Sequence, residues 1–165
     1  MSEQDSLSSL KGKVVATLIG ITCAEGSDGQ INFASPFVDD EGIDLIFFRR
    51  GGTGKAILAQ VKGRTTESKL LKRGIFRAQV RRASFKPRDG YYFIFAAFDK
   101  LEKKLRDTLW LVPSKDFERR LRGQKNKKVL VFQSRFDSED MWKEFRISLK
   151  DISQRVDEIL TDVRR

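Results

Sequence analysis

One aspartate and one Gln-x-Lys triplet are the residues of this sequence whose types and spacing suit chemistry on a phosphodiester. Asp44 lies near the start of an apolar segment, and Gln60 and Lys62 lie two positions apart in the next one. If both segments are strands, Gln60 and Lys62 project from the same face. If the strands also pair as a hairpin, Asp44 approaches that face. A carboxylate, an amide oxygen and an ammonium then converge at one end of a sheet.

These three groups can support metal-dependent hydrolysis. Mg²⁺ prefers hard oxygen ligands, which Asp44 and either the Gln60 side chain or a backbone carbonyl can supply. The metal would lower the pKa of a bound water and offset negative charge on the scissile phosphate. Lys62 would hold the nucleophile or stabilise the negative charge that develops. The chain has no histidine, which excludes a Ser-His-Asp triad, a histidine-based zinc site and a histidine general base.

Each residue also has a purely structural interpretation. Asp44 can be a turn residue that begins a strand, Gln60 a buried amide with hydrogen-bond partners, and Lys62 a solvated lysine at a strand end. Taken together they favour a site, because Gln60 and Lys62 interrupt an apolar strand where polar groups need partners. The acidic residues 39–41 are either a solvated turn or further metal ligands.

The elements that must position these residues follow from the spacing of apolar residues. Leu7, Leu10, Val14 and Leu18 fall at helical spacing, although β-branched residues in the same stretch also allow a strand. The continuous apolar run at 91–98 is typical of a central strand buried on both faces. The whole pattern predicts helices at 7–23, 67–85, 114–121 and from 152 onward, with strands at 31–38, 42–50, 56–64, 91–98, 108–112 and 128–133.

Two short stretches resemble a known nuclease superfamily. Residues 39–46 (DDEGIDLI) followed by residues 59–62 (AQVK) are similar to the motif of the PD-(D/E)xK nucleases, and more narrowly to the Gln-x-Lys variants of restriction enzymes that target methylated DNA. The resemblance implies an α/β, restriction-endonuclease-like fold. Its core would have the order αβββαβ, with a mixed central sheet flanked by helices and with C-terminal strand and helix additions.

The resemblance also implies roles for individual residues. Asp44 would be the principal metal ligand, Gln60 would replace the second acidic ligand, and Lys62 would be the catalytic lysine, with Mg²⁺ or Mn²⁺ as the cofactor. Because Gln60 carries no charge, Asp40 is a candidate for a further ligand. The superfamily often has a glutamate on its first helix. Residues 7–23 contain no Asp or Glu, and Glu25 is the candidate to take that place.

Basic residues dominate the segment that follows the Gln-x-Lys triplet. The chain has 33 Lys and Arg against 23 Asp and Glu, a formal charge of +10, and this surplus favours nucleic acid as a partner. Residues 68–88 include no acid, and on a helix their basic side chains would form a stripe that can track a phosphate backbone. The alternative is a solvated helix face. The candidate nucleic-acid-binding residues are Lys69, Arg73, Arg77, Arg81, Arg82, Lys86 and Arg88.

Other features carry weaker expectations. A second basic cluster at 119–128 either reaches a phosphate backbone or is simply solvated. Trp110 and Trp142 are expected in the core rather than stacked on bases. The lone Cys23 is expected to be a buried thiol, which fits a reducing cytoplasm. No apolar run is long enough for a membrane span.

The sequence predicts one domain at 7–165, with a core at 7–98, additions at 99–165 and a short disordered start at 1–6. The first functional hypothesis is a Mg²⁺-dependent endonuclease that cuts DNA rather than RNA in restriction, repair or defence. It would act as a homodimer or with a targeting partner. The second is a catalytically degenerate nucleic-acid-binding module of the same fold. The third is a toxin, effector or complex subunit whose basic face binds an acidic protein surface.

Overall fold

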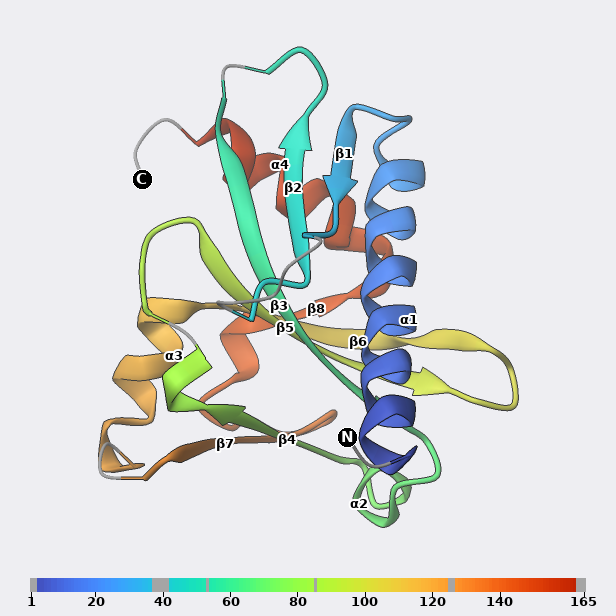
Figure 1. The fold of residues 1–165 in the computed structure, drawn as a ribbon, viewed down its shortest axis with the longest axis vertical. Coiled ribbons are helices and arrows are strands. Elements are labelled where there is room, and N and C mark those ends of the chain that lie inside the picture. The colour runs from blue at the N-terminus through green and yellow to red at the C-terminus, as the bar shows by residue number, and fades with distance from the viewer. Residues whose placement is uncertain (1–2, 37–41, 53, 85, 125–126, 163–165) are drawn as a thin grey trace.

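A mixed six-stranded sheet forms the centre of the molecule (Figure 1). The computed structural model describes residues 3–36, 42–52, 54–84, 86–124 and 127–162. Across the sheet the strands follow the order β1 (Ile31–Ala34), β2 (Leu45–Arg49), β3 (Ala56–Thr65), β5 (Tyr91–Asp99), β6 (Lys104–Pro113) and β8 (Arg146–Ser148). β3 and β5 run parallel, and the other neighbouring pairs in this sheet are antiparallel.

The remaining elements cover this sheet. β4 (Ile75–Arg81) and β7 (Val129–Arg135) pair antiparallel as a separate two-stranded ribbon. The helices are α1 (Glu3–Gly26), α2 (Lys69–Lys72), α3 (Ser114–Arg120) and α4 (Ile152–Thr161), and the 3-10 turns are η1 (Arg82–Ser84), η2 (Arg122–Gln124), η3 (Lys143–Phe145) and η4 (Leu149–Asp151). Within the described ranges, every helix is too short or too polar to cross a membrane.

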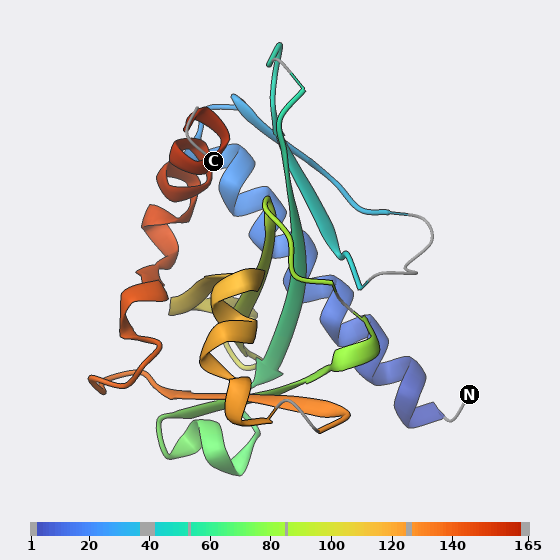
Figure 2. The same cartoon turned by 90° about the vertical axis from the view of Figure 1, so that its left-hand side faces the viewer.

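Two hydrophobic clusters fill the two sides of the sheet. On one side, α1 and α4 pack through residues such as Ile19 and Val156 against Val61 of β3. On the other side, the ribbon and α3 enclose an aromatic cluster in which the rings of Phe95 and Phe132 stack with centroids 3.8 Å apart. Figure 2 shows α3 in front of the strands and α1 behind them.

Residues of β3 alternate between these two sides. Ala59 and Val61 belong to the cluster under α1 and α4, whereas Leu58 packs against the aromatic cluster. Because alternate residues of a strand project to opposite faces, Gln60 and Lys62 project on the same side as Leu58. The predicted pair of polar side chains therefore lies on the face of the sheet that the ribbon covers.

Most of the predicted elements are present with shifted ends. The helix predicted at 7–23 is α1, and it begins at Glu3. The predicted strands correspond to β1, β2, β3, β5, β6 and β7, although residues 37–38 of the first lie outside the described residues. The helices predicted at 114–121 and from 152 onward are α3 and α4. β8 was not predicted, because its three residues are too few to display an alternating pattern.

The helix predicted at 67–85 is wrong over most of its length. The segment forms only the single turn α2 and then the strand β4. Gly74, with a φ of +72°, follows the helical turn and redirects the chain. Beyond it, Phe76, Ala78 and Val80 are buried and the residues between them are exposed, which is the alternation of a half-buried strand. The fifth element of the predicted αβββαβ order is therefore a short helical turn followed by a strand.

The predicted core positions of Cys23, Trp110 and Trp142 are confirmed, since all three side chains are fully buried. Cys23 lies on α1 against the sheet, and burial raises the pKa of its thiol to about 12. Both tryptophans belong to the aromatic cluster under the ribbon. They stabilise the fold and are not accessible to stack on nucleic-acid bases.

Candidate active site

Asp44 forms two hydrogen bonds with β3. Its backbone N–H donates to the carbonyl of Ala59 over 2.8 Å, and its carboxylate Oδ2 accepts from the backbone N–H of Val61 over 2.6 Å. β2 begins at the next residue, Leu45, which pairs antiparallel with Ala59. The carboxylate thus accepts a β3 backbone hydrogen bond one residue before the β2–β3 pairing starts. The predicted approach of Asp44 to the third strand is confirmed.

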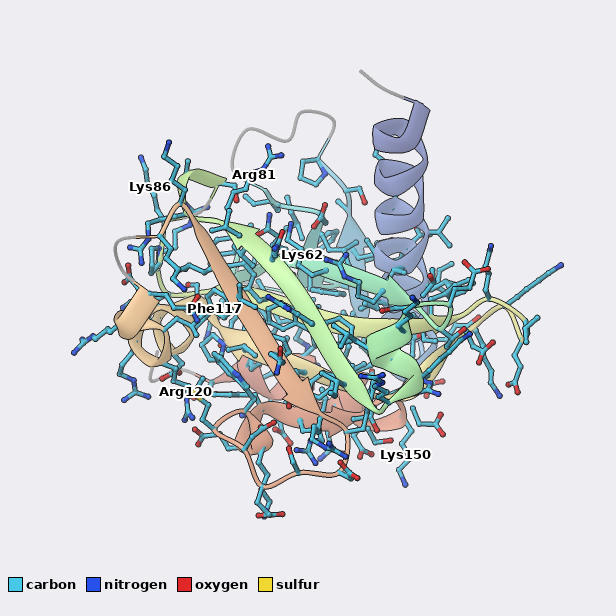
Figure 3. All side chains as sticks on the ribbon, turned by 90° about the horizontal axis from the view of Figure 1, so that it is seen from below. Lys62, Arg81, Lys86, Phe117, Arg120 and Lys150 are labelled. Atoms are coloured by element: carbon cyan, nitrogen blue, oxygen red, sulfur yellow. The ribbon has the colours of Figure 1, made fainter. Side chains whose placement is uncertain are left out.

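This bond sets the carboxylate beside the Gln-x-Lys triplet. Val61 stands between Gln60 and Lys62 along β3, and its N–H holds the Asp44 oxygen. Lys62 is half-buried on the ribbon side of the sheet. Figure 3 shows Lys62 on the same side of the molecule as Arg81 at the end of β4. The Asp44 carboxylate thus contacts β3 at the residue that separates Gln60 from Lys62.

Gln60 is a buried amide on the ribbon side of β3. Its side chain is 3% exposed, and its Oε1 is buried without a hydrogen-bond partner among the described residues. A buried amide oxygen without a partner costs about 1–3 kcal/mol. A cation or an ordered water at this oxygen would remove that cost.

Gly42 lies against the side-chain amide of Gln60. Its φ is +71°, and a Cβ at this position would lie 2.1 Å from Nε2 of Gln60 and 3.0 Å from the carbonyl oxygen of Ser84. A glycine is thus required both by the backbone conformation and by the close approach of the amide. Gly42 was not among the predicted site residues. Its place two residues before Asp44, where a strand begins, was the available signal.

The available donors suit a hard divalent cation. The Asp44 carboxylate and the Gln60 Oε1 are oxygen ligands, and Mg²⁺ commonly keeps several waters while binding one or two carboxylates together with substrate phosphates. Among the described residues, no three His, Cys, Asp or Glu side chains gather into a metal site. Asp40, the candidate for a further ligand, lies outside the described residues. A metal here would rest on few protein ligands.

Glu25 does not join the site. It is exposed in the last turn of α1, shortly before β1 begins at Ile31, which pairs with Arg49 at the far end of β2. The five residues of β2 place that end about 15 Å from Asp44. Between Gly12 and Ala24 the helix carries no other carboxylate that could replace it.

The predicted helical stripe of basic residues is also wrong, because the segment is a strand. Lys69 lies in α2, Arg73 ends that helix, and both are exposed at the start of the ribbon. Arg77 and Arg81 are exposed on β4, which at about 3.3 Å per residue extends for roughly 20 Å. Arg81 stands at the end of β4 that leads into η1, and it lies on the same side of the molecule as Lys62 (Figure 3).

The remaining predicted cations differ in their surroundings. Arg82 forms an ion pair with Glu118 over 3.8 Å, and the guanidinium of Arg88 lies 5.2 Å from the centre of the Tyr91 ring. Lys86 is exposed and lies on the same side as Lys62 and Arg81 (Figure 3). In the second basic cluster, arginines pair with acids of this chain: Arg119 with Asp116, and Arg120 with Glu144.

Arg64 is a further cation that the sequence analysis missed. It lies two residues beyond Lys62 on the same face of β3, and its Nε donates to the carbonyl of Arg77 over 3.0 Å. This bond ties β3 to the ribbon beside the site. The period-two spacing from Gln60 through Lys62 was the signal that could have identified it.

Comparisons with known proteins bear on the fold. No protein-family model matches the chain, and no curated protein matches it. A solved structure, that of the bacterial homing endonuclease I-Ssp6803I, is similar with a TM-score of 0.51 and 14% sequence identity. The similarity covers 92% of this chain and 92% of that chain. The chain therefore has a fold like that of a nuclease, with a mixed and mostly antiparallel central sheet.

Proposed function

We propose that this chain is a metal-dependent endonuclease of the PD-(D/E)xK type that hydrolyses phosphodiester bonds in DNA. The observation that carries the proposal is the Asp44 carboxylate held on the backbone N–H of Val61, between Lys62 and Gln60, whose buried Oε1 has no hydrogen-bond partner among the described residues. The nuclease-like fold supports the same conclusion.

Asp44 and Gln60 would hold Mg²⁺ or Mn²⁺ with their side-chain oxygens. When bound, such an ion supplies a more acidic water and offsets charge on the scissile phosphate. The Val61 N–H keeps the Asp44 carboxylate in one orientation, so that little reorganisation is needed when substrate arrives. The Lys62 ammonium donates hydrogen bonds to the attacking water or to a phosphate oxygen, where negative charge accumulates during the reaction.

DNA is the proposed substrate because of the charges around the site. The chain carries a formal charge of +10, and Arg81 and Lys86 are exposed on the side where Lys62 lies. These cations would contact the phosphate backbone on either side of the scissile bond and supply affinity that depends on salt. Two copies of the chain would present one active site to each strand of a duplex, so we expect the chain to act as a homodimer or with a targeting partner.

The test is cleavage of supercoiled plasmid in Mg²⁺ or Mn²⁺ by three purified proteins: the wild type, Lys62→Ala and Lys150→Ala. Lys150 is an exposed lysine on η4 and serves as the charge-matched control (Figure 3). We expect nicked or linear plasmid from the wild type and from Lys150→Ala, and none from Lys62→Ala. Equal cleavage by all three proteins would contradict the assignment.

A second candidate is a nucleic-acid-binding module that has lost hydrolysis. It is favoured by the uncharged Gln60 and by the lack of a carboxylate cluster among the described residues. Under this alternative, the wild type binds DNA with the salt dependence of phosphate contacts but cleaves no plasmid in either metal. The retained pairing of Asp44 with Lys62 favours the endonuclease, because binding alone has little use for it.

A further inference from the structure

The β4–β7 ribbon has one face in the core and one face in solvent. Phe76 and Val80 on β4 and Phe132 on β7 are buried in the aromatic cluster. In an antiparallel pair, residues directly opposite one another project to the same side. The outward face is therefore made of the pairs Ile75 with Arg135, Arg77 with Gln133, Gln79 with Val131, and Arg81 with Val129. We call these eight residues the outward face of the ribbon.

The composition of this outward face is unusual for a merely solvated surface. It combines arginine, glutamine and aliphatic side chains and contains no carboxylate. Among the described residues, none forms a hydrogen bond or an ion pair with the side chains of Arg77, Gln79, Arg81 and Gln133. Arg135 alone pairs with an acid, Asp137, in the turn beyond β7. The planar donor and acceptor groups of this face are thus available to a partner.

We propose that the outward face of the ribbon enters the major groove of duplex DNA and reads base edges there. In that groove, arginine pairs with the O6 and N7 of guanine, glutamine with the N6 and N7 of adenine, and an apolar side chain contacts the methyl group of thymine. A surface that only tracked phosphates would need cations alone. The glutamines and valines of this face add the two kinds of contact that distinguish base pairs.

The dimensions of the ribbon agree with this docking. Two paired strands lie about 4.8 Å apart, and a two-stranded ribbon fits a major groove about 12 Å wide. Arg77, Gln79 and Arg81 recur every second residue, about 6.6 Å apart along the strand. That spacing is close to two base-pair steps of about 3.4 Å. The deep, narrow major groove of duplex RNA does not admit such a ribbon, so the face selects DNA.

The outward face also adjoins the candidate active site. β4 ends at Arg81 and leads directly into η1, whose Ser84 carbonyl lies against Gly42, the glycine that also contacts the Gln60 amide. Figure 3 shows the β4 strand facing the viewer, with Arg81 at its end and Lys62 beside it. Reading a base sequence with the ribbon would therefore fix which phosphodiester lies at Lys62. In this respect the inference rests on the proposed function.

The test begins with binding selection. The full-length protein is mixed with a library of random-sequence DNA duplexes in EDTA, at constant salt, and the bound sequences are read. Affinities for the selected duplex and for its single-base variants are then measured with Gln79→Ala and Arg77→Ala. The matched controls are Gln30→Ala, which removes an exposed glutamine before β1, and Lys150→Ala.

We expect the wild type to select a preferred sequence and Gln79→Ala to lose about 10-fold discrimination at one base pair. Because Gln79 is uncharged, its loss leaves the affinity for unrelated DNA and the salt dependence unchanged, a pattern that a phosphate contact would not give. Arg77→Ala should lose discrimination at a different base pair and also weaken binding to unrelated DNA. Both controls should behave as the wild type does.

Two results would overturn the inference: a wild type that selects no sequence, or a preference that both ribbon variants retain. These results are separable from failure of the proposed function. Sequence-selective binding that depends on Gln79, without cleavage in any metal, would support base reading by the ribbon and contradict the proposed endonuclease activity. Cleavage without sequence preference would support the endonuclease activity and contradict base reading by the ribbon.

Discussion

The carboxylate Oδ2 of Asp44 lies 2.6 Å from the backbone nitrogen of Val61 and accepts its hydrogen bond. Asp44 directly precedes β2 and Val61 belongs to the neighbouring strand β3, so the orientation of the proposed metal ligand depends on the register between these two strands. A small shift of β2 against β3 would misplace the carboxylate.

Replacing Asp44 should separate catalysis from binding. We expect Asp44→Ala to abolish plasmid cleavage while binding to DNA is retained, because the residue supplies a metal ligand and not a phosphate contact. The lost hydrogen bond should also cost about 1.5–3 kcal/mol in the free energy of unfolding, measured by urea titration. Asp44→Asn, which keeps an acceptor of the same shape, should recover most of that stability but no cleavage. Cleavage by Asp44→Asn at the wild-type rate would contradict the metal-ligand role.

Replacing Gly42 should disturb Gln60 directly. Gly42→Ala places a Cβ 2.1 Å from the Gln60 Nε2 at a φ of +71°, and we expect a loss of about 1–3 kcal/mol from backbone strain plus a further loss from the clash. Gly29→Ala is the control, because Gly29 has a φ of +74° with open space around its Cβ position. A second substitution, Gln60→Ala, should relieve part of the Gly42→Ala defect in urea denaturation. Equal losses for the two glycine variants would show that the amide is not held against Gly42.

Removing Lys86, an exposed lysine on the same side of the molecule as Lys62, should change the salt dependence of DNA binding. We expect Lys86→Ala to weaken binding to all DNA sequences and to reduce the slope of log affinity against log salt by about 0.9. Lys150→Ala should leave the slope unchanged. Filter binding between low and physiological salt measures both. An unchanged slope for Lys86→Ala would exclude a phosphate contact at this residue.

The buried thiol of Cys23 gives a prediction for pH. Its pKa rises from 9.0 to about 12 on burial, so the unfolded chain releases this proton at lower pH than the folded chain does. The thiol's contribution to stability is fully present below pH 9.0 and is lost as the pH rises from 9.0 to about 12. Cys23→Ala should lack this component, which unfolding titrations at pH 8 and pH 10.5 would detect. The native thiol should also resist aromatic disulfide reagents at pH 8 until urea unfolds the chain.

Secondary structure could be predicted from the sequence where the local spacing of apolar residues allows one element type only. The approach of Asp44 to the strand of Gln60 and Lys62 was predicted because two consecutive apolar segments favour a hairpin, and β2 and β3 do pair antiparallel. The segment 67–85 was misassigned because Leu71, Ile75 and Ala78 satisfy a helical spacing while Phe76, Ala78 and Val80 satisfy an alternating one. Pairing with β7 decides between these possibilities, and β7 lies far along the chain. The position of Glu25 likewise depends on the pairing of β1 with β2, which no local pattern specifies.

Alternate residues of β4 project to opposite faces, so the buried residues and the exposed residues can have different roles. The inward residues Phe76, Ala78 and Val80 hold the ribbon to the aromatic core, whereas the residues between them contribute little to stability. Specificity could therefore change by substitutions that cost the fold almost nothing and leave Asp44 and Lys62 untouched. A chain built in this way can be retargeted, by natural drift or by directed evolution, one outward residue at a time.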